Sequence, residues 1–88
     1  MATDATADLP LSYTTIELES YLPTGWSLAE RDPTWDAKKS AFRVQVIDGS
    51  DLDWELFVPK AEADRHGRIE ALRRAVDRLD RERFKSFL

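Results

Sequence analysis

Two neighbouring segments of alternating apolar and polar residues constrain this chain most. In residues 41–47 (AFRVQVI), alternation places three apolar side chains on one face of an extended strand: Phe42, Val44 and Val46. Residues 52–58 (LDWELFV) repeat the pattern with Leu52, Trp54, Leu56 and Val58. Each segment is therefore expected to be a half-buried strand whose apolar face must be covered by another element.

The loop between these segments, Asp48-Gly49-Ser50, determines which residues face each other. A two-residue Asp-Gly turn would place Val44 opposite Asp53 and break the apolar face. A loop of three or five residues instead places Val44 opposite Trp54 and Arg43 opposite Glu55. We therefore expect an antiparallel hairpin closed by an odd-numbered loop.

Helical patterns flank the strands. Thr14-Thr15-Ile16-Glu17 fits a capping box, and the helix that it begins should end before Pro23 and Gly25. Apolar residues repeat every three or four positions in residues 68–83, which predicts a long helix. Residues 60–63 could add an earlier helical turn. A further strand is expected to begin at residues 26–29.

The fold class that follows is α+β. We expect a three-stranded antiparallel sheet, a long C-terminal helix packed on one face and a short N-terminal helix, in the order α-β-β-β-α. Residues 1–11 show no periodicity and are expected to form a disordered tail, and residues 12–88 to form one small domain.

Composition excludes several functional classes. The chain has no cysteine and a single histidine, His66, so a disulfide framework or a multi-histidine metal site is excluded. No cofactor motif or positioned nucleophile appears, and a two-layer domain of 88 residues should be too thin to enclose a pocket of ~300 Å³ or more. We expect a protein without enzymatic activity or cofactor. With no apolar run of ~20 residues and no leader pattern, we expect no membrane association and a cytoplasmic location.

Charge divides unevenly along the chain. Residues 1–58 hold four basic and eleven acidic residues, a net −7, whereas residues 59–88 hold nine and six, a net +3. In the last helix, Arg74, Arg78, Arg81 and Lys85 recur at helical spacing, as in a stripe that contacts a phosphate backbone. Interleaved acids, Glu70, Asp77 and Glu82, are expected to neutralise these arginines. The sequence therefore disfavours nucleic-acid binding, which we retain only as the alternative hypothesis for the function.

Four aromatic residues exceed what a two-layer core needs: Trp35, Phe57, Phe84 and Phe87. Trp35 is either an interface anchor or, as we favour, folded over the edge of the core. Strand parity places Phe57 on the sheet face away from the long helix. The predicted function is a small non-enzymatic protein-interaction or accessory module. Its partner is a second copy of the chain or an unidentified protein.

Overall fold

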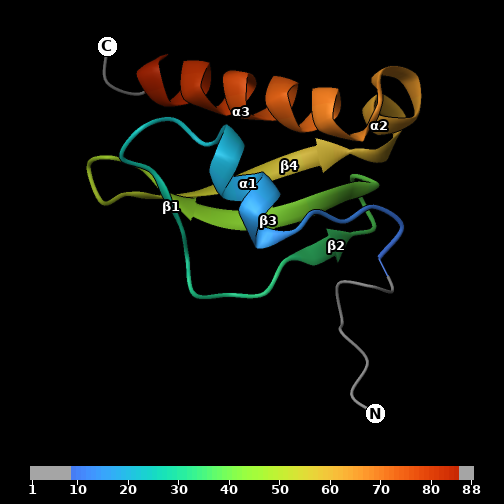
Figure 1. Cartoon of the computed structure of the whole chain (residues 1–88), viewed down its shortest axis with the longest axis horizontal. Coiled ribbons are helices and arrows are strands. Elements are labelled where there is room, and N and C mark those ends of the chain that lie inside the picture. Colours follow the sequence, from blue (N-terminus) through green and yellow to red (C-terminus); the bar gives the residue numbers. More distant parts are fainter. Residues whose placement is uncertain (1–8, 86–88) are drawn as a thin grey trace.

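The computed structural model describes residues 9–85 and has the predicted α+β fold (Figure 1). In this range the elements follow the order α1 (Thr15–Tyr21), β1 (Ser27–Leu28), β2 (Thr34–Asp36), β3 (Ala41–Ile47), β4 (Asp53–Pro59), α2 (Lys60–His66) and α3 (Arg68–Lys85). The sequence did not predict β2, and it indicated α2 only as a possible turn. The capping box at Thr14 is confirmed, because its hydroxyl accepts from the Glu17 amide and the Glu17 carboxylate accepts from the Thr14 amide.

The sheet is antiparallel and centred on β3. Strand β4 pairs along the whole of one edge of β3, while β1 and β2 pair with opposite ends of its other edge. Residues 29–33, between these two short strands, lie outside the sheet. The second edge of β3 is therefore bordered by two strands separated by a loop.

The register of β3 and β4 differs from our prediction by two residues. Val44 faces Leu56 and Gln45 faces Glu55, so the predicted pairs of Val44 with Trp54 and of Arg43 with Glu55 are wrong. The loop, residues 48–52, is odd-numbered as predicted, and a shift of two residues keeps every side chain on its predicted face. Arg43 still reaches Glu55 diagonally, with Nη2 3.4 Å from Oε2.

The side chain of Asp48 accounts for the wider loop. Its Oδ1 accepts hydrogen bonds from the amides of Ser50 (2.7 Å) and Leu52 (3.1 Å). The backbone closes the same loop, since the Asp48 amide donates to the Leu52 carbonyl and the Asp51 amide to the Asp48 carbonyl. These bonds stabilise a five-residue loop in which Asp51 adopts a left-handed conformation (φ 63°).

Both α1 and α3 cover one face of the sheet, where α3 runs along β4 and α1 packs against α3 and β1 (Figure 1). The core combines the predicted strand and helix faces with two residues that precede α1: Leu11, Tyr13, Leu18, Phe42, Val44, Val46, Leu56, Val58, Ala71, Leu72, Ala75, Val76 and Leu79. The Tyr13 ring packs edge-on against Phe42, with ring centroids 5.2 Å apart. Leu11 is only 7% exposed, which corrects our placement of residue 11 in a disordered tail.

Helices α2 and α3 meet at Gly67, whose φ of 94° and ψ of 154° suit glycine almost alone. The two helices are also joined by a bidentate ion pair. Arg78 Nη1 and Nη2 donate to the two Glu62 oxygens at 3.0 and 3.1 Å. This junction fixes how α2 packs beside α3.

Candidate functional site

The three aromatic candidates within residues 9–85 do not form one surface. Trp35 lies on β2 opposite Phe42, on the core face, and packs against the core as favoured from the sequence. Phe57 lies opposite Arg43 on the other face, with Lys39 Nζ 4.1 Å from its ring centroid. Phe84 is 62% exposed near the end of α3, and Phe87 lies outside the described residues.

The arginine stripe is paired differently from our prediction. Arg74 does bind Glu70, at 3.0 Å. Arg78 binds Glu62 of α2 instead of Glu82, and Asp77 accepts from Arg73 (3.2 Å) instead of Arg81. Within residues 9–85, Arg81 and Lys85 therefore have no carboxylate partner. The predicted neutralisation of the stripe is incomplete.

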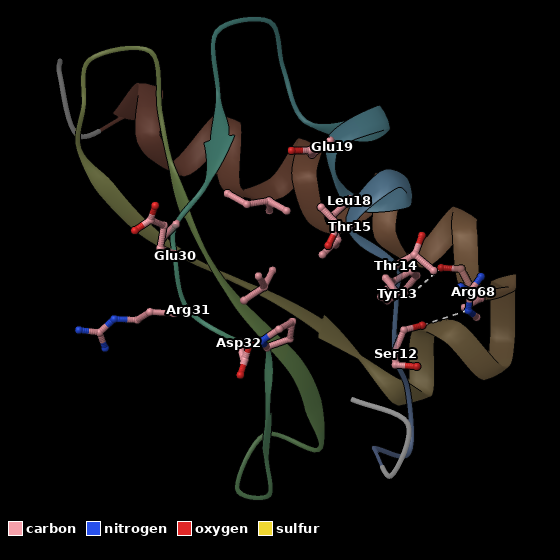
Figure 2. Close-up of a pocket in the computed structure, with 14 residues that line it drawn as sticks. Ser12, Tyr13, Thr14, Thr15, Leu18, Glu19, Glu30, Arg31, Asp32 and Arg68 are labelled. Carbon is pink, nitrogen blue, oxygen red and sulfur yellow. Dashed lines mark hydrogen bonds between the residues drawn. The ribbon is translucent and has the colours of Figure 1, made fainter. Parts of the chain in front are cut away.

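A surface groove of about 730 Å³ lies between the start of the domain and the segment that follows β1 (Figure 2). Figure 2 shows Glu30, Arg31 and Asp32 along one wall, and Ser12 to Thr15, Glu19 and Arg68 along the other. This groove is open to solvent, so it differs from the enclosed pocket of ~300 Å³ that we expected so thin a domain to lack. The groove forms beside the two layers instead of between them, so the thickness of the layers does not limit it.

The groove exists because the sheet edge is interrupted. Residues 29–33 leave the sheet after β1 and return to it at β2, and this detour forms one wall. The segment entering α1, together with α1 itself, forms the opposite wall. Three apolar side chains from α1, β1 and β3 line the groove between the walls: Leu18, Leu28 and Val44. A ligand in the groove would therefore meet an apolar floor.

A hydrogen-bonded latch fixes the wall that contains α1. Arg68 donates through both terminal nitrogens to Glu17 (3.0 and 2.5 Å) and through Nε to the Ser12 carbonyl (3.2 Å). The Tyr13 hydroxyl donates to the Arg68 carbonyl at 2.5 Å. Burial raises the pKa of Tyr13 to about 12, and the hydrogen bonds from Arg68 hold the pKa of Glu17 below its usual value. At neutral pH, Tyr13 is therefore protonated and Glu17 is ionised, as these hydrogen bonds require. The wall is thus formed before a ligand binds.

Acidic side chains line both sides of the groove. Glu19 of α1 points toward the opposite wall, which carries Glu30 and Asp32 (Figure 2). Within the described part of the chain, none of these three carboxylates forms an ion pair. The positive charge of Arg68 is taken up by Glu17, and Arg31 is directed away from α1. The groove thus presents carboxylates that are free to accept a cation.

Asp48, which the sequence placed only in the loop between two strands, is a second polar centre. Asp48 is only 2% exposed. Its Oδ1 accepts from the two loop amides, and its Oδ2 accepts from Trp54 Nε1 (2.9 Å) and Arg83 Nε (2.7 Å). All its acceptor positions face donors within the protein. Asp48 therefore joins the β3–β4 loop to the end of α3 and is not placed to bind a ligand.

Comparisons with protein-family models, curated proteins and solved structures find no match to this chain. Between residues 9 and 85, no helix has the length and apolar character to cross a membrane. The same residues contain no group of three or more His, Cys, Asp or Glu side chains placed to hold a metal ion.

Proposed function

We propose that this chain is a small non-enzymatic protein-interaction module. Its groove would bind an extended segment of a partner protein that carries lysine or arginine beside apolar residues. The observation that carries this proposal is the combination of apolar lining residues, Leu18, Leu28 and Val44, with unpaired carboxylates on both walls, Glu19 and Asp32.

The floor and the walls would contribute differently to binding. Burying one apolar side chain on the floor stabilises a complex by ~1.5–3 kcal/mol, whereas an exposed ion pair adds only ~0.2–1 kcal/mol. Apolar contact would therefore supply most of the affinity, and Glu19 and Asp32 would select a cationic partner. After the cost of ordering a flexible segment, we expect a dissociation constant on the order of 100 µM.

The charge of the whole chain supports a basic partner. The groove is built mainly from the first 58 residues, which carry a net −7. Such a field attracts basic segments and repels polyanions approaching from this side. The preformed wall adds to the affinity, because the Arg68 latch already orders the segment that a partner would touch.

Panning a random heptapeptide display library against the immobilised chain tests the proposal. We expect enrichment of sequences that combine Lys or Arg with Leu, Ile or Val, and loss of that enrichment in Glu19→Gln/Asp32→Asn. The control Asp53→Asn/Asp64→Asn removes the same charge from exposed residues that do not line the groove and should preserve the enrichment. Enrichment without a basic preference, or equal loss in both variants, would refute a site in the groove.

A further inference from the structure

A second depression, of about 300 Å³, lies between α2 and α3. Of the residues in these two helices, only Arg68 lines the groove. Basic side chains dominate its lining, which comprises Glu62, Arg65, His66, Arg74, Asp77, Arg78 and Arg81. We call this site the α2–α3 notch. The predicted stripe lay on α3 alone, whereas the folded chain adds Arg65 and His66 from α2 and leaves Lys85 outside the lining.

The acids in the notch are already occupied. Glu62 accepts both donors of Arg78, and Asp77 accepts from Arg73, which is outside the lining. Arg74 is paired with Glu70, also outside the lining. Within residues 9–85, the side chains of Arg65, His66 and Arg81 have no hydrogen-bonding or ionic partner.

This arrangement concentrates positive charge that the protein does not neutralise locally. Four guanidinium groups line the notch against two carboxylates, so the lining has a net charge of +2 with His66 neutral. Like charges at three- and four-residue spacing on a helix destabilise it slightly, and an anion bound among them would relieve that repulsion. Arg78 is held in place by Glu62, so part of the site is oriented before any anion arrives.

From these contacts we infer that the α2–α3 notch binds the phosphate group of a small anionic compound, with Arg65 and Arg81 as its principal donors. A guanidinium presents paired N–H donors that match the geometry of phosphate oxygens. The notch is a single depression and not a continuous track, so one or two phosphate groups fill it. The inference does not depend on the peptide groove, because no residue lines both sites and the two sites present opposite signs of charge.

NMR titration of the full chain with inorganic pyrophosphate tests this inference. We expect saturable shifts of the Arg65 and Arg81 side-chain Nε–Hε signals, and at least a tenfold higher dissociation constant in Arg65→Gln/Arg81→Gln. The control Arg31→Gln removes another exposed, unpaired arginine and should leave binding unchanged. The absence of saturable shifts at the notch, or equal binding by the double variant and the wild type, would overturn the inference.

A parallel titration with a thymidine decanucleotide distinguishes the sources of phosphate. Tighter binding of pyrophosphate than of the oligonucleotide at the same signals would support a small free compound, as inferred. Oligonucleotide binding at least tenfold tighter, with a steep loss as salt rises, would identify a polynucleotide instead and overturn the small-compound assignment.

Discussion

The hydrogen bond from Trp54 to the buried Asp48 carboxylate allows a quantitative stability prediction. Trp54→Phe removes the Nε1 donor, 2.9 Å from Asp48 Oδ2, but keeps an aromatic ring on β4. A hydrogen bond to a charged group contributes ~1.5–3 kcal/mol. For a domain of this size, that loss corresponds to a decrease in Tm of roughly 6–24 °C.

Trp35→Phe is the matched control. It makes the same chemical change at another partly buried tryptophan, whose Nε1 forms no hydrogen bond in residues 9–85. The difference between the two variants therefore isolates the hydrogen bond from the loss of ring area. Urea denaturation followed by far-UV circular dichroism measures both free energies of unfolding without relying on tryptophan fluorescence. If the two variants differ by less than ~0.5 kcal/mol, the reasoning about Asp48 is wrong.

Two further predictions concern pH and the α2–α3 junction. Burial raises the pKa of Asp48, but hydrogen bonds from Arg83, Leu52, Trp54 and Ser50 outweigh burial and leave the pKa well below its ordinary value of 3.8. The stability contributed by ionised Asp48 is thus present above about pH 4 and lost as pH falls further, so acid denaturation curves of Asp48→Asn should be flatter than those of the wild type. Gly67→Ala should destabilise the chain by ~1–3 kcal/mol through backbone strain alone, because a Cβ there contacts nothing within 4 Å; a thermal midpoint equal to that of the wild type would contradict this.

The features that sequence analysis predicted correctly are those encoded by local spacing. Alternation assigned the faces of β3 and β4, three- and four-residue repeats located α3, and Thr14 with Glu17 marked the start of α1. Each pattern lies within a few residues of the element that it determines. The fold class followed because two half-buried strands and one amphipathic helix can cover each other in few ways.

The features that it missed depend on contacts between distant residues. The register of β3 and β4 is set by the Asp48 side chain, which also binds Arg83, 35 residues away. Strand β2 spans only Thr34–Asp36, too short to show alternation, and is defined by pairing with β3. The groove needs α1 to face residues 29–33, and the notch needs α2 folded against α3. The sequence shows the acidic residues Glu19, Glu30 and Asp32, but only the fold brings them to one groove.

A titration with two peptides of opposite charge tests the proposed interaction module most directly. The probes are an alternating Lys-Val pentapeptide and an alternating Glu-Val pentapeptide, each added to ¹⁵N-labelled chain at low salt. We predict that the Lys-Val peptide shifts the amide signals of Thr15, Glu19 and Asp32 in a saturable manner, and that the Glu-Val peptide does not. Equal responses to both peptides, or shifts confined to residues outside the groove, would contradict the proposal.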